Sequence, residues 1–184
     1  MNNDTNYHTN NHTTIVTSYF QIKSKFPHIQ YLEWMKNMLY HIASPMVIFT
    51  DKNTVSIIKE MRKPHLNNTR IIITSISEFY CYKWKDCWNF HYKYDPEQQI
   101  HSPELYMIWA EKTEMVRKAI ELDPFGSEFY LWSDHHLLPR SSKFFGYSQI
   151  HATYPRTINY GWNNRSFRTY LWYAPDCPPY AYLK

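Results

Sequence analysis

Apolar residues along positions 14–134 form two kinds of pattern, which alternate along the chain. The first kind is a short, nearly continuous apolar run that is rich in β-branched and aromatic residues. Such runs are typical of strands, and uninterrupted apolar character is typical of parallel strands that are buried on both faces of a sheet. We therefore predict four strands, with the sequences TIVTSYF at 14–20, SPMVIFTD at 44–51, TRIIITSI at 69–76 and EFYLW at 128–132.

The second kind of pattern places apolar residues three or four positions apart, which is the spacing of one face of a helix. It predicts helices over residues 29–42 and 53–63, between the strands. The longest helix is expected to begin after Ser102, a residue type that caps helix N-termini well, and to end near Leu122. The apolar positions of these helices are Tyr31, Trp34, Met35 and Met38, then Val55, Ile58 and Met61, and then Leu105, Ile108, Met115 and Ile120.

The predicted elements follow the order strand, helix, strand, helix, strand, helix, strand. Helices that connect parallel strands pack back onto the faces of the sheet. We therefore expect a three-layer α/β fold with crossover helices and a mostly parallel sheet of about four strands. The polar residues 1–13 are expected to be a disordered tail and residues 14–134 to form the α/β domain. Residues 135–184, with their prolines and scattered aromatics, are expected to be irregular.

Composition and charge narrow the classes of function. The 184 residues include only 3 glycines, which disfavours a glycine-rich phosphate loop. The formal net charge of +4 comes from interspersed Lys and Arg, as on a solvated surface rather than a dedicated nucleic-acid face. Residues 80–94 (YCYKWKDCWNFHYKY) nevertheless interleave basic and aromatic side chains, as surfaces that bind single strands do. A non-enzymatic binding module for single-stranded nucleic acid or a protein partner is therefore the alternative hypothesis.

The cysteines and the lengths of the apolar runs indicate in which cellular compartment the protein is expected. Cys81, Cys87 and Cys177 form no C-x-x-C pair and are odd in number, which predicts free thiols rather than a disulfide framework. The first residues lack the apolar segment of a secretory signal. No apolar run approaches the roughly 18 residues of a membrane span. We expect a cytoplasmic protein without a membrane span.

Several of these segments carry a resemblance to a known family. They are TIVTSYF, YLEWMKNML, PMVIFTD and the run from DPEQQIHSPELYMIWAEK to DPFGSEFYLWSD, which ends at Asp134. In them, residues 14–134 resemble the HtrL/YibB family, which is similar to glycosyltransferases of the A-type, nucleotide-sugar-binding fold. The resemblance implies that a nucleotide sugar binds in the crevice at the carboxyl ends of the strands.

Candidate site residues follow from this position in the fold. In glycosyltransferases of this type an acidic motif after the fourth strand holds Mn²⁺ or Mg²⁺, which neutralises the diphosphate leaving group. The resemblance places Asp134 in that motif. Asp51, at the end of the second predicted strand, is a candidate to accept hydrogen bonds from a base or ribose. Thr17 and Tyr19, near the end of the first strand, are candidates to line the nucleotide pocket.

After Asp134 the chain departs from the family pattern. The family continues with a pattern like W-x-D-I-G-C-F-R, whereas this chain reads WSDHHLLPR. A single carboxylate is a poor site for a divalent ion without a second protein ligand. Of the adjacent His135 and His136, only one could join Asp134 at one ion, because neighbouring side chains of an extended segment point to opposite sides. Trp109 and Lys112, on the long helix, are expected only to pack against the domain.

The loss of one nucleotide in the gene would explain this departure. A family-like continuation that loses one nucleotide can be translated into residues 148–163, so the other reading frames after codon 134 are predicted to restore a family-like sequence. The acceptor site of a transferase is expected to come from sequence beyond the acidic motif. The sequence therefore predicts a glycosyltransferase-like domain, truncated or degenerate, that binds a nucleotide sugar and has weak or no activity.

Overall fold

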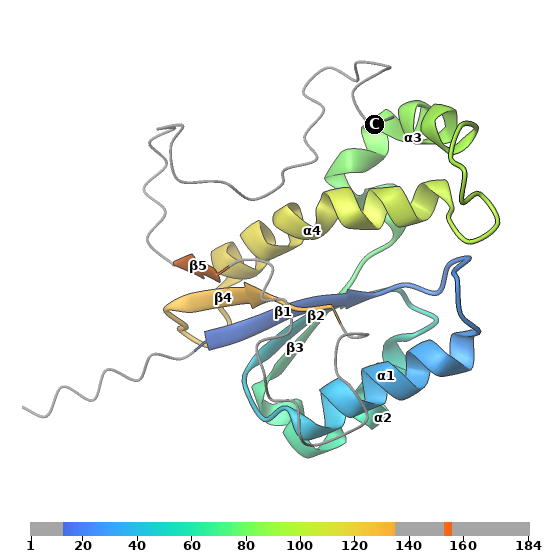
Figure 1. The fold of residues 1–184 in the computed structure, drawn as a ribbon. Helices are drawn as coiled ribbons and strands as arrows, with labels where there is room; N and C mark the ends of the chain where they lie inside the picture. The colour runs from blue at the N-terminus through green and yellow to red at the C-terminus, as the bar shows by residue number, and fades with distance from the viewer. Residues whose placement is uncertain (1–12, 135–152, 156–184) are drawn as a thin grey trace, which may run out of the picture.

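The computed structural model describes residues 13–134 and 153–155, which are drawn in colour in Figure 1. Its strands are β1 (Thr13–Tyr19), β2 (Met46–Thr50), β3 (Thr69–Ile73), β4 (Phe129–Trp132) and β5 (Thr153–Pro155). Its α-helices are α1 (His28–His41), α2 (Val55–Met61), α3 (Lys85–Tyr92) and α4 (Pro103–Leu122). Short 3₁₀ helices are η1 (Lys63–Asn68), η2 (Ile76–Glu78) and η3 (Tyr80–Trp84). Each strand and helix predicted between positions 14 and 132 is present.

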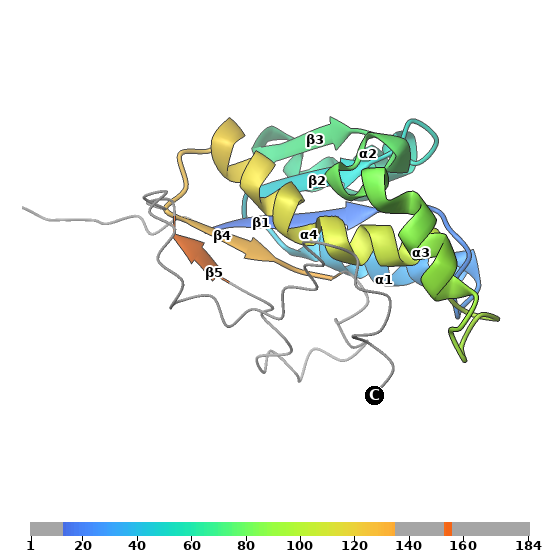
Figure 2. The ribbon, with the colours of Figure 1, turned by 90° about the horizontal axis from the view of Figure 1, so that it is seen from above.

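The sheet has the strand order β3-β2-β1-β4-β5, and β1 to β4 are all parallel. The helices α1 and α2 lie on one face of the sheet and α4 covers the other (Figures 1 and 2). The predicted three-layer α/β class with four parallel strands is confirmed. The strand β5 is an addition, because it pairs antiparallel to β4 from within the segment that the sequence predicted to be irregular. Without it, one side of β4 would present unpaired backbone groups, which readily accept another strand.

The central strand β1 contributes to a hydrophobic core on each face of the sheet. Successive side chains of a strand point to opposite faces, so Val16 belongs to the core under α4 and Ile15 to the core over α1. The core on the α4 side consists of Val16, Phe20, Val47, Phe49, Phe79, Cys81, Met107, Met115, Val116, Ala119, Tyr130 and Trp132. The core on the α1 side consists of Ile15, Tyr19, Met35, Met38, Leu39, Met46, Ile48 and Ile58. Burial on both faces explains why these strands read as continuous apolar runs.

The helix α4 agrees with its prediction at both ends. Ser102 is its N-cap, and the Ser102 hydroxyl oxygen accepts a hydrogen bond from the Leu105 amide at 3.4 Å. At the other end Asp123 adopts the left-handed conformation, with a φ of 37°, and so stops the helix. The Asp123 carboxylate also accepts a hydrogen bond of 2.7 Å from the Tyr130 hydroxyl, which ties the helix end to β4.

Arg62, directly after α2, connects three parts of the α1 face. Its side chain is 0% exposed. It donates hydrogen bonds to the carbonyl oxygens of Leu39 (3.0 Å), Ile42 and Ser44 (2.7 Å) and to Oγ1 of Thr69 (2.8 Å). Burial lowers the pKa of the guanidinium to about 10, which leaves it charged at neutral pH. The end of α1, the start of β2 and the start of β3 are therefore held by one buried cation.

Two sequence-based expectations are wrong within the described residues. The helix α3 was not predicted, and the reason is visible in its packing: it lies against η3 and α4 but buries none of its residues completely, so it has no clear apolar face. Free thiols were predicted, and Cys81 is free and buried, whereas Cys87 is disulfide-bonded.

In the described part of the chain, no helix has the length and hydrophobicity needed to cross a bilayer. Of the predicted tail over residues 1–13, Thr13 is the first residue of β1 and residues 1–12 lie outside the described residues. His135, His136 and the predicted frameshifted residues 148–152 and 156–163 also lie outside them.

Candidate functional site

The order of the strands defines one position where a ligand site is expected. The strands β2 and β3 lie on one side of β1, and β4 lies on its other side. The order of the strands therefore reverses at β1, and the connections that leave the ends of β1 and β4 lead away from each other. Open parallel sheets bind ligands at such a point, at the carboxyl ends of the strands. We call the junction between the carboxyl ends of β1 and β4 the switch point. The four predicted site residues, Thr17, Tyr19, Asp51 and Asp134, lie in or just after β1, β2 and β4.

Asp134 lies at the switch point, two residues after β4. The backbone of the intervening Ser133 still pairs with β1, since its amide donates to the Val16 carbonyl at 3.0 Å. Both carboxylate oxygens of Asp134 accept hydrogen bonds, one from Lys112 Nζ at 2.8 Å and one from Trp132 Nε1 at 3.0 Å. Trp132 belongs to the core under α4. The carboxylate is therefore held against α4, at the partly exposed edge of that core.

The Mn²⁺ or Mg²⁺ that the family resemblance implies does not fit the described residues at Asp134. The ammonium of Lys112 already occupies the position beside the carboxylate that a cation would take. Such hard cations need several oxygen ligands. The described residues include no group of three or more His, Cys, Asp or Glu side chains that could hold a metal ion.

Tyr19 faces α1 rather than the switch point. Its hydroxyl is hydrogen-bonded to Nδ1 of His28 at 2.6 Å, and the two rings stack. Burial above all, and then the negative charge of Asp51 and the neighbouring Tyr31, raise the pKa of Tyr19 to about 12. The side chain thus has a structural role in joining β1 to the start of α1.

Thr17 is also part of the core on the α1 side. It is buried, and the small space that it lines together with Met35, Leu39 and Ile48 has no room for a water molecule. Its hydroxyl oxygen has no hydrogen-bond partner among the described residues. Because Thr17 and Tyr19 are two residues apart in one strand, they share this face. The predicted nucleotide pocket is not found on their side of the sheet within the described chain.

Asp51 caps the turn that leads into α2. Its Oδ1 atom accepts hydrogen bonds from the amides of Asn53 (2.8 Å) and Thr54 (2.9 Å) and from the Thr54 hydroxyl (3.0 Å). These bonds satisfy donors at the helix start that have no partner within the helix. Capping therefore accounts for this oxygen of Asp51 without a ligand.

Replacing Asp51 with alanine is expected to lower the free energy of unfolding by about 1 kcal/mol, because the amides lose their acceptor. Asp51→Asn retains a side-chain carbonyl and should lose less. Urea unfolding of the two variants measures the difference. If Asp51→Asn instead leaves stability unchanged and abolishes nucleotide binding, Asp51 contacts the ligand and the capping role is not its main one.

Two residues of α4 that were expected only to pack have surroundings that suggest more. Lys112 reaches the end of β4, as described above, and Trp109 is 47% exposed one turn earlier. Nearby, at the start of α4, His101 Nδ1 is hydrogen-bonded to Asp95 at 2.7 Å, and the Tyr106 hydroxyl donates to the same carboxylate. The His101 ring lies edge-on to Trp109, with centroids 5.6 Å apart. This flank of α4 therefore combines an exposed ring with ordered polar groups.

The Asp95 carboxylate is kept charged by its hydrogen bonds. Burial alone would raise the pKa of Asp95, but hydrogen bonds from Tyr106, the Glu97 amide and His101 outweigh it and hold the pKa below its usual value. Burial, and then the hydrogen bond to Asp95, raise the pKa of Tyr106. Asp95 thus fixes the orientation of the His101 ring at the N-terminal end of α4. From the sequence, Ser102 was assigned a role as the helix cap, and the neighbouring His101 was not assigned one.

Comparison with known proteins does not identify a relative. No protein-family model, curated protein or solved structure matches the chain. The function therefore has to be inferred from the position and chemistry of the groups at the switch point.

Proposed function

We propose that residues 14–134 form a nucleotide-sugar-binding domain of the glycosyltransferase type, truncated or degenerate, with weak or no transferase activity. The strand order β3-β2-β1-β4 carries this proposal, because it creates a switch point at the end of β1. Parallel sheets of this kind bind nucleotides there. The resemblance of the chain to the HtrL/YibB family, which rests on the segments named above, supports the same proposal.

Lys112 at the switch point and Trp109, one turn earlier on α4, have the chemistry that a nucleotide sugar needs. Lys112 provides a positive charge for phosphate, and the exposed ring of Trp109 provides an apolar surface on which a sugar or base can stack. The expectation of weak or no turnover has a physical reason at Asp134. A carboxylate that already accepts bonds from Lys112 and Trp132 has less capacity to serve as a base or a metal ligand.

A nucleotide screen tests the proposal. We expect at least one of UDP, GDP, UDP-sugars or GDP-sugars to raise the Tm of the full chain, while uridine and guanosine, which lack phosphates, do not. A ligand at a hundred times its Kd adds about 2.7 kcal/mol, which corresponds to a Tm increase of roughly 5–10 °C for a chain of this size. If none of these nucleotides changes the Tm, with or without Mn²⁺, the proposal is wrong.

The predicted weakness of turnover is tested separately. We expect no more than trace hydrolysis or transfer of UDP-sugars or GDP-sugars in the presence of Mn²⁺. Efficient turnover that Asp134→Ala abolishes would show that the site is intact. Binding without turnover is the expected result.

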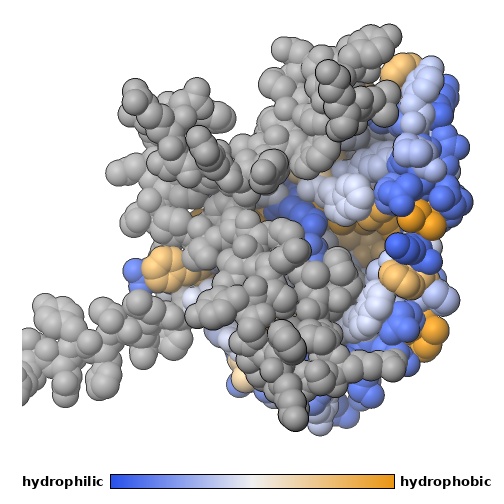
Figure 3. Space-filling view, viewed as in Figure 1, coloured by the Kyte–Doolittle hydropathy of each residue, from blue (hydrophilic) through white to orange (hydrophobic). Residues whose placement is uncertain are grey.

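The alternative, a basic aromatic surface for single strands, has one observation in its favour and one against it. Phe90 and Tyr94 of the α3 region are exposed and lie together, with ring centroids 5.1 Å apart. The rings of Tyr80 and Trp84, however, are already contacted by the Lys83 ammonium at 3.7 and 4.2 Å from their centroids. In Figure 3, hydrophobic residues outside the grey atoms are interspersed with hydrophilic ones. The contacts of Lys83 leave less surface of the Tyr80 and Trp84 rings for base stacking, so we favour the nucleotide-sugar proposal.

A further inference from the structure

The environment of Lys112 is unusual for a helix lysine. Its neighbours one turn away on each side are Ile108, which packs against the core under α4, and Val116, which is a buried member of that core. The side chain of Lys112 therefore emerges from the sheet-facing side of α4, and it is only 25% exposed. A lysine at such a position needs a specific partner, because burial disfavours an unpaired charge.

The ammonium is held in place by two contacts. Asp134 Oδ2 accepts its hydrogen bond at 2.8 Å, and the ring of Trp132 lies 5.5 Å from Nζ, within the range of a cation–π contact. Trp132 also donates its indole N–H to the other oxygen of Asp134. Because an ammonium has three N–H donors, bonding to Asp134 leaves donors on the same group for an anion.

A divalent cation and this ammonium exclude each other. A metal ion coordinated by Asp134 would lie within a few ångströms of Nζ, where two positive charges repel strongly in a partly buried site. The ion would also have to displace both the Lys112 and the Trp132 hydrogen bonds from the carboxylate. Among the described residues, the Asp134 carboxylate is therefore already paired with a cation.

We propose that Lys112 takes the place of the divalent cation, so that a diphosphate group binds at this switch point through the lysine ammonium and without a metal ion. The identity of the diphosphate as part of a nucleotide sugar rests on the proposed function. Asp134 is then a positioning residue that orients Lys112, and it is not a metal ligand.

Binding of UDP, GDP and inorganic pyrophosphate to the full chain, measured by calorimetry in EDTA and again in Mn²⁺, tests this. We expect the Kd of a bound probe to differ by less than about twofold between the two conditions, because no metal takes part. Lys112→Met should weaken binding about tenfold or more in both, through loss of charge-assisted hydrogen bonds. Lys118→Met is the matched control on the same helix. The Lys118 ammonium lies 3.5 Å from Glu111, and this variant should bind as the unchanged chain does.

Asp134→Asn separates the two roles of that residue by the sign of its effect. If Asp134 orients Lys112, removal of its negative charge should leave binding in EDTA unchanged or tighten it by about threefold, since the anion loses a nearby like charge. If Asp134 is a metal ligand, the same variant should weaken binding in Mn²⁺. A purely structural role of Lys112 would not produce tighter binding in Asp134→Asn.

The binding results bear on two proposals, the role of Lys112 and the proposed function. Nucleotide binding that requires Mn²⁺ and is lost in Asp134→Asn overturns the role of Lys112 but supports the proposed function. Pyrophosphate binding in EDTA that depends on Lys112, with no binding of UDP or GDP, supports the role of Lys112 and contradicts the proposed function. If no probe binds in either condition, both are wrong.

Discussion

Replacing Arg62 with methionine is expected to lower the free energy of unfolding by about 3–5 kcal/mol, a large part of the stability of a single domain. The cause is the set of carbonyl acceptors that would lose their donor. The carbonyl oxygens of Leu39, Ile42 and Ser44 all receive hydrogen bonds from its guanidinium. Methionine fills similar space but donates nothing, so the Leu39 oxygen would be buried without this donor and the partly buried oxygens of Ile42 and Ser44 would lose it as well. Urea unfolding followed by tryptophan fluorescence measures the loss.

Two further substitutions separate this cause from a general effect of losing an arginine. Arg70 lies in β3 and is exposed, so Arg70→Met should change stability by no more than about 0.5 kcal/mol. Arg62→Lys retains the charge but lacks the planar group that reaches several acceptors at once, and it should be less destabilising than Arg62→Met. If Arg62→Met unfolds at the same urea concentration as the unchanged chain, the guanidinium does not hold the α1 face together.

The layers of the fold were predictable because burial on both faces leaves a direct record in the sequence. Val47 and Ile48 are neighbours in β2, yet they belong to the cores on opposite faces of the sheet. Apolar residues are favoured at both positions, and the resulting apolar run identifies a parallel strand. The start of α4 was equally clear, since capping at Ser102 is a local interaction that depends on nearby residues alone.

The candidate site was predictable in position but not in its contacts. Asp134 was expected at the end of a strand and lies there, whereas its partner Lys112 is 22 residues earlier in the chain. Whether a helix residue reaches the end of a strand depends on the rotation of the helix and its packing on the sheet, which no local pattern specifies. A signal existed nonetheless, because Lys112 interrupts the apolar side of α4 between Ile108 and Val116.

Thr17 and Tyr19 illustrate a different limit. The period of two in a strand predicts that both share a face. It does not say which face, because β1 is buried on both sides and its two rows of side chains look alike in sequence. Only packing against α1, including the bond between Tyr19 and His28, shows that the pair belongs to the core and not to the crevice.

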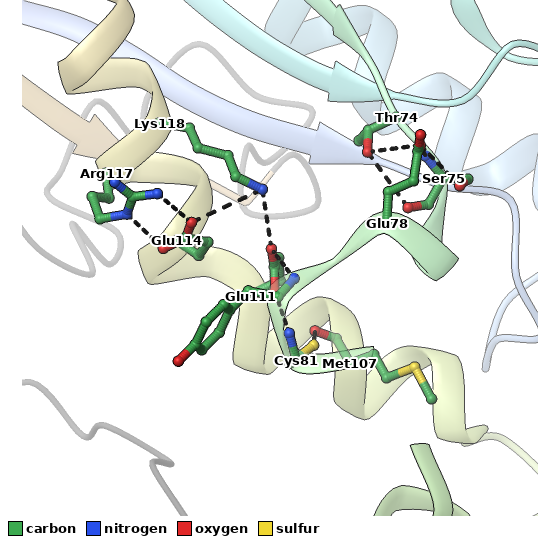
Figure 4. Close-up of polar contacts among 10 residues, drawn as sticks. Thr74, Ser75, Glu78, Cys81, Met107, Glu111, Glu114, Arg117 and Lys118 are labelled. Atoms are coloured by element: carbon green, nitrogen blue, oxygen red, sulfur yellow. Dashed lines mark hydrogen bonds and ion pairs between the residues drawn. The ribbon is translucent and has the colours of Figure 1, made fainter. Parts of the chain in front are cut away.

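On the α4 side of the sheet, Glu111 is a buried charged residue that hydrogen-bonds to the backbone of another element, as Arg62 is on the α1 side. It is 1% exposed, and its two carboxylate oxygens accept hydrogen bonds from the amides of Tyr80 (2.9 Å) and Cys81 (3.0 Å) at the start of η3 (Figure 4). Lys118 lies 3.5 Å from one of these oxygens. Next to it, the Cys81 thiol donates to the Met107 carbonyl, and burial followed by the charge of Glu111 raises the pKa of that thiol. One carboxylate therefore connects η3 to the middle of α4.

Glu111→Leu is expected to lower the free energy of unfolding by about 3–5 kcal/mol, because the buried Cys81 amide and the partly buried Tyr80 amide lose their acceptors and Lys118 loses the closer of its two carboxylate partners. Hydrogen exchange should show the damage where it arises, as faster exchange of the Tyr80 and Cys81 amides. Glu121→Leu is the matched control, since Glu121 is half exposed and its ion pair with Arg117 should contribute less than about 1 kcal/mol. Equal losses in the two variants, or unchanged exchange at Tyr80 and Cys81 in Glu111→Leu, would show that the carboxylate is not what joins η3 to α4.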